Sequence, residues 1–319
     1  MEGEGTVSDS PDRIGFLGLG LMGAGMAARV HASGMPLIVY DLLEERCARF
    51  RAMGVDVAAS ARDLADRAEI VVSCLPSIDV SRQVSCGSGG VIEGRAVKVY
   101  VETGTVGTAA MIEIAEALSK VGIATIDGPV SGGQTGADMG TLSTILAGSP
   151  HTVARFRPVA EAYSSRVFVV SDRPGPAQTA KLVNNMLSIT GMIAAFEGMV
   201  MGAKAGLDPQ TMLDIINVST GRNSATLEKI PQRILPRKFG GHVSTGVKDL
   251  GLYISESEEL EVPVWMATRA LEVFREAIGH GFDKETMRII QYMEALAGGI
   301  EVKGRGLAGE ALANGKGEK

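Results

Sequence analysis

Short apolar runs recur along the first half of the chain, and the stretches between them space their apolar residues differently. The runs are four to seven residues long, rich in Val and Ile and almost uninterrupted, which is typical of parallel strands buried on both faces. Segments between the early runs, such as MGAGMAARVHASG and TAAMIEIAEALSKVG, have helical spacing. This alternation predicts an α/β fold with a doubly wound, mostly parallel sheet. The expected strands are 14–18, 36–41, 70–76, 97–103, 123–127, 143–148 and 167–170.

The pattern changes after Pro174, where no further strand-like run occurs. The segment 177–205 is long, apolar and free of proline, which predicts one long helix that crosses between two domains. The second half is therefore expected to be an all-helical domain, with further helices at 208–217, 224–235, 247–260, 264–279 and 283–297. The predicted organisation is a disordered N-terminus at 1–13, a sheet domain at 14–174, a helical domain at 175–300 and a flexible tail at 301–319.

Composition narrows the class of protein. A chain of 319 residues suits one large or two ordinary domains, and its net charge of −6 argues against a nucleic-acid binder, which would carry a basic face. The three cysteines have no metal-ligand spacing, and their odd number disfavours a disulfide framework, so a cytoplasmic protein is expected. The acidic N-terminus does not have the features of a signal peptide, and no uninterrupted apolar run approaches the length of a membrane span.

A glycine-rich turn follows the first predicted strand. Gly18, Gly20 and Gly23 fit the pattern G-x-G-x-x-G between a strand and a helix. In this arrangement the first glycine permits a tight turn, the second lets the backbone approach a pyrophosphate, and the third lets the helix pack closely on the sheet. The alternative is a glycine-rich turn without a ligand, but the strand, helix and second strand around the motif favour a dinucleotide site. The predicted cofactor contacts are Gly18, Leu19, Gly20, Leu21, Met22 and Gly23.

Asp41 ends the second predicted strand, eighteen residues after Gly23. A carboxylate at this point can accept hydrogen bonds from the adenosine ribose hydroxyls and would repel a 2′-phosphate. The sequence therefore predicts NAD as the cofactor, while Arg46 downstream leaves NADP possible.

Three later segments combine polar groups with small or apolar neighbours. Ser131, Gly132 and Gly133 could form a backbone nest for an anion, or simply a flexible turn. Lys181 and Asn185 are four residues apart on a mostly apolar helix, where the charged form of lysine is disfavoured, although a lysine whose head reaches water fits the same pattern. Lys248 precedes an aspartate, which by itself indicates a surface ion pair.

Taken together and in this order, the segments resemble the β-hydroxyacid dehydrogenase family, which includes 3-hydroxyisobutyrate dehydrogenase and tartronate semialdehyde reductase. The resemblance rests on FLGLGLMGAGMA at 16–27, on the stretch from Asp127 to Leu142, on G-x-x-x-x-x-K-x-x-N-N from Gly175 to Asn185, and on K-D-L at 248–250. It runs from about Ile14 to Leu296. It implies a Rossmann-type domain followed by a helical domain, and a metal-independent enzyme that moves a hydride between NAD(H) and a small 3-hydroxy acid.

The resemblance also implies roles for matching residues. Lys181 is similar to the general acid/base of the family, and Asn185 would orient it and the substrate. The nest at 131–133 would hold the substrate carboxylate, and Lys248 would close over the nicotinamide and contact the substrate. Cofactor contacts are further implied for Leu75, Pro76 and Thr105. Family members of this size are expected to form homodimers or homotetramers through the long helix.

Two departures from the family pattern leave the substrate open. The segment from Glu102 to Thr108 does not have the second serine and the proline of the family's D-x-S-T-x-x-P loop, and Gly241 stands where an aromatic residue is usual, with His242 nearby as a possible substrate neighbour. The identity of the hydroxy acid, its chirality and the physiological direction are not predicted. Alternatives are an NADPH-linked glyoxylate or succinic semialdehyde reductase, an imine reductase, which Lys181 and Asp41 argue against, and a non-catalytic cofactor-binding scaffold.

Overall fold

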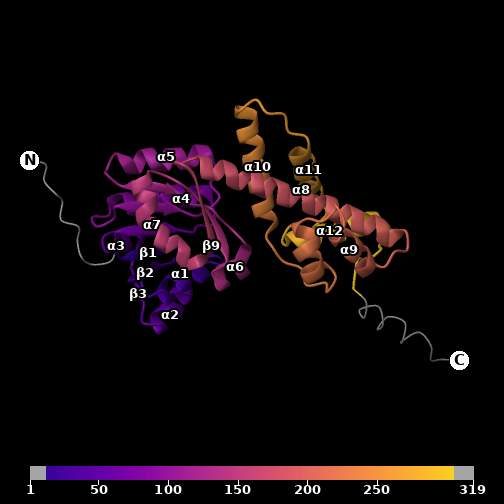
Figure 1. Cartoon of the computed structure of the whole chain (residues 1–319), viewed down its shortest axis with the longest axis horizontal. Helices are drawn as coiled ribbons and strands as arrows, with labels where there is room; N and C mark the ends of the chain where they lie inside the picture. The colour runs from indigo at the N-terminus through magenta and orange to yellow at the C-terminus, as the bar shows by residue number, and fades with distance from the viewer. Residues whose placement is uncertain (1–11, 305–319) are drawn as a thin grey trace, which may run out of the picture. The chain divides into compact units, whose positions relative to one another are not determined.

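The computed structural model describes residues 12–304, so most of the predicted disordered N-terminus and most of the predicted flexible tail lie outside the described residues. The chain divides into two compact units, residues 1–181 and 182–319, and the division falls within helix α8 (Pro176–Lys204). The predicted domain boundary at 174/175 lies just before this helix begins. Figure 1 shows the sheet unit in indigo to magenta and the helical unit in orange to yellow.

The first unit is built on a nine-stranded sheet in the order β3-β2-β1-β4-β5-β6-β8-β7, with β9 paired to β8. The strands from β3 to β6 are parallel, whereas β8 runs antiparallel to β6 and β7, so the prediction of a mostly parallel sheet is correct. All seven predicted strands exist, and two short ones, β3 and β7, were not predicted. The strands are β1 (Ile14–Leu17), β2 (Leu37–Tyr40), β3 (Asp56–Val57), β4 (Ile70–Ser73), β5 (Val99–Glu102), β6 (Ala124–Asp127), β7 (Val130–Ser131), β8 (Leu142–Ala147) and β9 (Ser164–Ser171).

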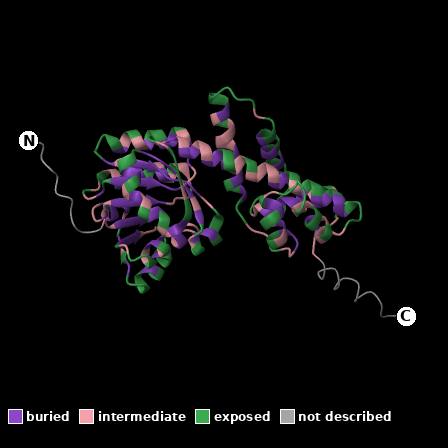
Figure 2. Cartoon of the chain, in the orientation of Figure 1, coloured by how far each residue is buried: buried purple, intermediate pink, exposed green. Residues whose placement is uncertain are grey.

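Helices cover both faces of this sheet because alternate residues of each central strand point to opposite faces. Phe16 packs with α1 (Gly23–Ala32) and α7 (Pro150–Tyr163), while its neighbour Leu17 packs with α3 (Ala61–Ala65) and α5 (Thr108–Ser119). Figure 2 shows the central strands in purple and exposed green residues on the surrounding helices. The remaining helical segments of this unit are α2 (Glu44–Ala52), α4 (Ile78–Cys86), η1 (Val91–Glu93) and α6 (Gly133–Met139).

The second unit is helical, as predicted, and has its own core around Phe196 and Phe274. The predicted helix at 224–235 is π-helical instead of α-helical. It contains Pro231, which has no backbone N–H to donate within the helix. The predicted helix at 283–297 begins with one 3₁₀ turn. The elements are α9 (Pro209–Asn217), η2 (Ala225–Ile234), α10 (Val243–Glu259), α11 (Met266–Gly279), η3 (Thr286–Arg288) and α12 (Ile289–Leu296).

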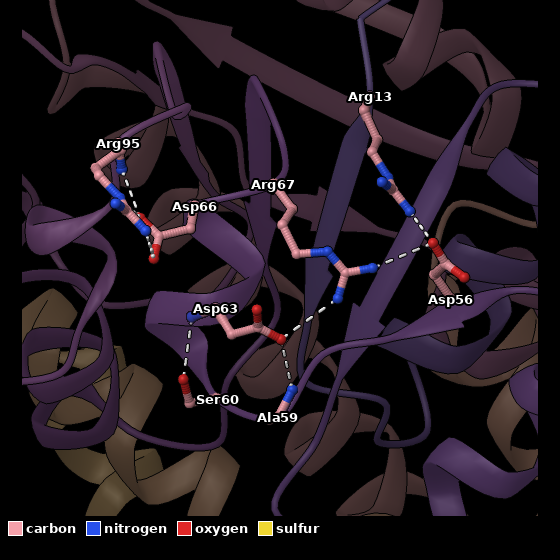
Figure 3. A network of polar contacts seen from close by, with 8 residues as sticks. All are labelled: Arg13, Asp56, Ala59, Ser60, Asp63, Asp66, Arg67 and Arg95. Carbon is pink, nitrogen blue, oxygen red and sulfur yellow. Dashed lines mark hydrogen bonds and ion pairs between the residues drawn. The ribbon is translucent and has the colours of Figure 1, made fainter.

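Charged groups near the amino end of β1 form a surface network (Figure 3). Asp56 pairs with Arg13 and with Arg67, and Arg67 also reaches Asp63, at 3.2 and 3.4 Å. Each of these side chains is at least 31% exposed, so each pair contributes about 0–1 kcal/mol to stability. This network belongs to the surface of the fold, and the candidate chemistry lies at the other end of the strands.

Helix α8 is the one helix of the described chain that is long and apolar enough to cross a membrane. Length and composition alone are weak evidence, and the buried contacts at its first turn, described below, fasten it to the sheet unit. We interpret α8 as a helix shared by the two units of a folded protein rather than as a membrane span.

Candidate active site

The central strands β1, β4, β5 and β6 end side by side. Leu17 pairs with Ser73, Ser73 with Glu102, and Glu102 with Asp127, so the four last residues form one row across the sheet. From β1 the chain adds β2 and β3 on one side and then β4 and β5 on the other, so the strand order reverses at β1. Open α/β sheets bind ligands at such a switch point. Predicted cofactor contacts follow the ends of β1, β4 and β5, and Asp41 follows the neighbouring parallel strand β2, so these residues lie at one edge of the sheet.

The turn after β1 has the geometry that a pyrophosphate site requires. Gly18 has a φ of +87°, and a Cβ there would lie 2.3 Å from the carbonyl oxygen of Cys74. A Cβ on Gly23, where α1 begins, would lie 1.9 Å from the carbonyl oxygen of Gly18. A Cβ on Gly20 would meet nothing closer than 4.0 Å, so its backbone faces open space. The three glycines therefore fit a dinucleotide, whose phosphates would lie at the N-terminus of α1.

Asp41 lies beside this turn. Its Oδ2 accepts a hydrogen bond from Leu19 N at 2.7 Å, and its Oδ1 accepts one from Leu43 N at 2.9 Å. Arg46 forms an ion pair with Oδ2 at 3.2 Å. From the sequence, Arg46 leaves NADP possible as a cofactor. In the structure its guanidinium lies against the carboxylate of Asp41.

A hollow of about 470 Å³ opens next to Gly20 and Arg46. Arg49 also lines it, and sequence reasoning did not single out this residue. Because two guanidinium groups border the hollow, the site offers positive charge as well as the carboxylate of Asp41. Leu19, Leu21, Ala24, Gly25, Ala28, Gln134 and Asp138 complete its lining.

The other predicted cofactor contacts occupy neighbouring loops. Leu75 is half-buried and Pro76 exposed in the loop between β4 and α4, and Thr105 is half-buried between β5 and α5. Their positions match the implied roles, which remain predictions.

Glu102, the last residue of β5, is completely buried. Its Oε2 accepts hydrogen bonds from Tyr100 Oη at 2.8 Å and Ser73 Oγ at 3.2 Å, and its Oε1 accepts one from Gly104 N at 2.9 Å. Burial raises the pKa of this carboxyl, and the hydrogen bonds oppose that rise only in part.

We predict that Glu102→Gln flattens the dependence of stability on pH. In the wild type the folded chain retains a proton on Glu102 at pH values where the unfolded chain has lost it, so the free energy of unfolding falls as pH rises through the raised pKa. The amide removes this contribution and still fits, since the hydroxyls of Tyr100 and Ser73 can turn to accept from it. Urea unfolding at about pH 5 and pH 8 measures the slope. A slope equal to that of the wild type would contradict the prediction.

The predicted nest begins in β7 and continues into α6. Ser131 is the last residue of β7, Gly132 has a φ of +130° and Gly133, the first residue of α6, a φ of +65°. Two consecutive glycines with positive φ allow a backbone turn that other residues rarely adopt. The role of this turn in holding a carboxylate stays a prediction.

Lys181 lies in the second turn of α8 and is 8% exposed. The start of its helix is fastened by Asp127, whose Oδ2 accepts from Gly175 N and Gln178 N, both at 3.0 Å, and whose Oδ1 accepts from Gln178 Nε2 at 2.9 Å. Burial raises the pKa of Asp127 to about 7, and these donors oppose the rise.

Sequence reasoning quoted Asp127 only as part of a motif and did not identify Gln178 as a site residue. The available signal was weak: a glutamine three residues before a lysine on an apolar helix. Its partners lie more than 50 residues away along the chain, where no local pattern can indicate them.

In the helical unit, Asp249 links two predicted residues. Its Oδ2 accepts a hydrogen bond from Asn185 Nδ2 at 2.7 Å, and its Oδ1 pairs with Lys248 Nζ at 2.8 Å. Asp249 is only 5% exposed, so the interpretation of the dipeptide as a surface ion pair is wrong. A buried carboxylate of this kind orients both partners at once.

The histidines and other possible metal ligands are the remaining candidates. Within residues 12–304 no three His, Cys, Asp or Glu side chains are grouped as metal ligands would be. His242 directly precedes α10 and is exposed.

Sequence models of two domain families match the chain. Residues 13–171 match the NAD binding domain of 6-phosphogluconate dehydrogenase, and residues 175–293 match the NAD-binding domain of NADP-dependent 3-hydroxyisobutyrate dehydrogenase. Among curated relatives, the 2-(hydroxymethyl)glutarate dehydrogenase of Eubacterium barkeri is 32% identical over 92% of this chain and 98% of its own. The mitochondrial 3-hydroxyisobutyrate dehydrogenase of Mus musculus is 31% identical over 88% of this chain and 86% of its own.

Solved structures agree with these matches. A 3-hydroxyisobutyrate dehydrogenase from Salmonella typhimurium superposes with a TM-score of 0.80 at 30% identity, covering 88% of this chain and 99% of its own. An imine reductase from Streptomyces aurantiacus superposes with a TM-score of 0.61 at 18% identity, over 88% of this chain and 99% of its own, which shows a shared fold only.

The glycine turn, the row of strand ends and the long helix thus define an oxidoreductase that acts on hydroxyl groups with a nicotinamide dinucleotide. The chain belongs to the β-hydroxyacid dehydrogenase family, among the relatives of 3-hydroxyisobutyrate dehydrogenase.

Proposed function

We propose that this protein oxidises a small 3-hydroxy acid, or reduces the matching semialdehyde or oxo acid, with Lys181 as general acid/base. The observation that carries the proposal is the burial of Lys181 on α8, one helical turn before Asn185, in a chain whose glycine turn fits a dinucleotide. Lysine is seldom buried to this extent in folded proteins, and acid–base chemistry gives Lys181 a reason to be there.

When bound, the nicotinamide supplies or accepts the hydride. The chain's own residues perform the remaining work at the substrate hydroxyl. In oxidation the neutral amine of Lys181 takes the hydroxyl proton, and in reduction its ammonium returns that proton to the same oxygen. The positive charge of Lys181 also stabilises negative charge that develops on this oxygen.

The supporting residues orient the two reactants. Asn185 and Lys248 are held through Asp249, and we propose that they contact the substrate, with Lys248 also near the cofactor. The nest at 131–133 holds the substrate carboxylate. The residues proposed to hold the cofactor are Gly18, Leu19, Gly20, Leu21, Met22, Gly23, Asp41, Leu75, Pro76 and Thr105.

An activity panel tests the substrate class. The full chain is assayed with short 3-hydroxy acids, including 3-hydroxyisobutyrate, 2-(hydroxymethyl)glutarate and L-threonate, with NAD⁺ and NADP⁺, and in reverse with the corresponding oxo compounds. We expect turnover of at least one 3-hydroxy acid. Turnover of only glyoxylate or succinic semialdehyde would favour the alternative function, an NADPH-linked reductase. The positively charged Arg46 and Arg49 beside the hollow are the observation that supports NADPH as its cofactor.

We further propose that the protein is a homo-oligomer that associates through α8. Val183, Leu187 and Met201 are 42, 62 and 69% exposed, and their spacing places them on one side of the helix. Exposed apolar stripes of this kind mark protein–protein contacts in soluble proteins. A dimer and a tetramer are both compatible with this stripe.

Leu187→Glu is expected to shift the protein to a smaller species, because a charge in an apolar contact is costly to desolvate. Light scattering after size-exclusion chromatography measures the mass. Val121→Glu is the matched control, because Val121 is also exposed (54%) but follows α5 in the sheet unit. An unchanged mass for Leu187→Glu would contradict association through this face.

We propose the cytoplasm as the location. Cys47, Cys74 and Cys86 are free thiols, and burial raises the pKa of Cys74 to about 11, so this thiol is not reactive at neutral pH. A reducing compartment suits these thiols.

A further inference from the structure

The side chain of Gln178 is fully buried, and its amide is fully hydrogen-bonded. Oε1 accepts from Val106 N at 2.9 Å and Gly107 N at 3.1 Å, while Nε2 donates to Gly104 O at 3.1 Å and to Asp127 Oδ1 at 2.9 Å. An amide has two donor hydrogens and an oxygen that accepts two bonds, so every bonding position is used.

These bonds join three parts of the first unit. The loop at 104–107 contains Thr105, Asp127 ends β6, and Gln178 belongs to the first turn of α8. The first four N–H groups of a helix have no partner within the helix, and Asp127 accepts the N–H groups of Gly175 and Gln178. The loop, the strand end and the helix start are therefore held together by buried bonds.

This arrangement carries a cost that a simple helix start would avoid. The groups that donate to Asp127, Gly175 N and the backbone and side-chain amides of Gln178, are all neutral, and burying a carboxylate without a cation is unfavourable. A serine or threonine cap satisfies one N–H group, such as that of Gln178, without a buried charge, whereas Asp127 accepts from the N–H of Gly175 as well. The use of Asp127 and Gln178 instead indicates that the position of the first turn of α8 relative to β6 and the 104–107 loop is important.

We propose that Gln178 is a positioning residue: it holds the helical turn that carries Lys181 at a fixed place relative to the loop that carries Thr105. Lys181 follows three residues after Gln178, so the two share one side of α8. The inference rests on the proposed role of Lys181. Its physical reason is that a displacement of about 1 Å between reacting groups can cost a factor of about 100 in rate.

The first test is Gln178→Glu in the full chain. The new side chain keeps the shape and the acceptor for Val106 N and Gly107 N. If it is ionised, Asp127 and Gly104 O both repel it, and if it is protonated, its single O–H can donate to only one of them. We expect kcat to fall at least about tenfold, while the Kd for NADH, measured by fluorescence, changes less than about threefold.

The second test reverses the bond between the two side chains. In the double variant Asp127→Asn with Gln178→Glu, the amide introduced at 127 donates to the carboxylate introduced at 178. The amide oxygen at 127 still accepts from Gly175 N and Gln178 N. We expect the double variant to recover a substantial part of the lost kcat, so that the two changes are strongly non-additive.

The matched control is Thr179→Val. Thr179 is the next residue of the same helix, and its hydroxyl contacts at 3.0 Å the hydroxyl of Thr108, the first residue of α5, instead of a group within the 104–107 loop. Thermal melting of every variant separates stability from rate. A wild-type kcat in Gln178→Glu, or an equal loss of kcat in Thr179→Val at an equal loss of Tm, would overturn the proposal.

A second readout does not need turnover. In the full chain labelled with lysine ¹³C at Cε, the signal of Lys181 is identified by its absence in Lys181→Ala. We expect this signal to shift in Gln178→Glu, to return in the double variant and to stay in place in Thr179→Val. If the wild type turns over no hydroxy acid, the proposed function fails, and this signal still decides the positioning role.

Variants that fail to fold also give a decision. If Gln178→Glu does not fold but the double variant folds with activity, the reversed bond itself supports the proposal. If the double variant and the uncharged, equally long Gln178→Met both fail to fold, Gln178 serves the stability of the unit, and the positioning role is overturned.

Discussion

Lys181→Ala is expected to lower kcat by about two to four orders of magnitude, the usual contribution of a positioned acid or base. The reason is that Lys181 is the residue proposed to exchange a proton with the substrate hydroxyl. Cofactor binding should persist, because the glycine turn and Asp41 follow β1 and β2 and are not part of α8. Steady-state kinetics in both directions, together with NADH binding, measures the two effects separately.

Two further variants sharpen this test. Lys181→Arg retains the charge but holds its proton too tightly to exchange it, so it should remain nearly inactive. Lys204→Ala removes the other lysine of α8, whose exposed amine donates to Ala297 O at 2.8 Å, and should keep wild-type turnover. Substantial dehydrogenase activity in Lys181→Ala would refute the assignment of the acid/base.

Asp41→Asn is expected to shift cofactor preference from NAD toward NADP by at least about tenfold in kcat/KM, which corresponds to about 1.4 kcal/mol. The change removes the negative charge that would repel a 2′-phosphate. It also releases Arg46 from its 3.2 Å ion pair, and Arg46 and Arg49 then both remain to attract the phosphate at the hollow beside Gly20. Kinetics with NAD⁺ and NADP⁺ at saturating substrate gives the ratio.

The control for this prediction is Asp56→Asn, which removes an acidic group of the same unit from the network in Figure 3. It should leave the cofactor ratio unchanged. A wild type that already uses NADPH more efficiently than NADH would show that the carboxylate of Asp41 does not set the preference.

The order of the elements and the position of the glycine turn could be read from the sequence because their causes are local. Buried parallel strands need continuous apolar runs, and the turn at Gly18 needs a residue without a Cβ, so both leave marks on neighbouring positions. The short strands β3 and β7 have only two residues each and leave no such mark. The π-type turns at 225–234 differ from an ordinary helix by one hydrogen-bond position, which apolar spacing does not reveal.

The sequence by itself determined the class of this protein: an α/β sheet unit with a dinucleotide turn, a helical unit, and Lys181 and Asn185 one turn apart on the helix that joins them. Only the tertiary structure decided that Asp249 is buried between Asn185 and Lys248, that Arg46 pairs with Asp41, and that Asp127 and Gln178 hold the start of α8. Backbone pattern depends on residues near in the chain. The partners of a buried polar group are set by which distant segments the fold packs around it.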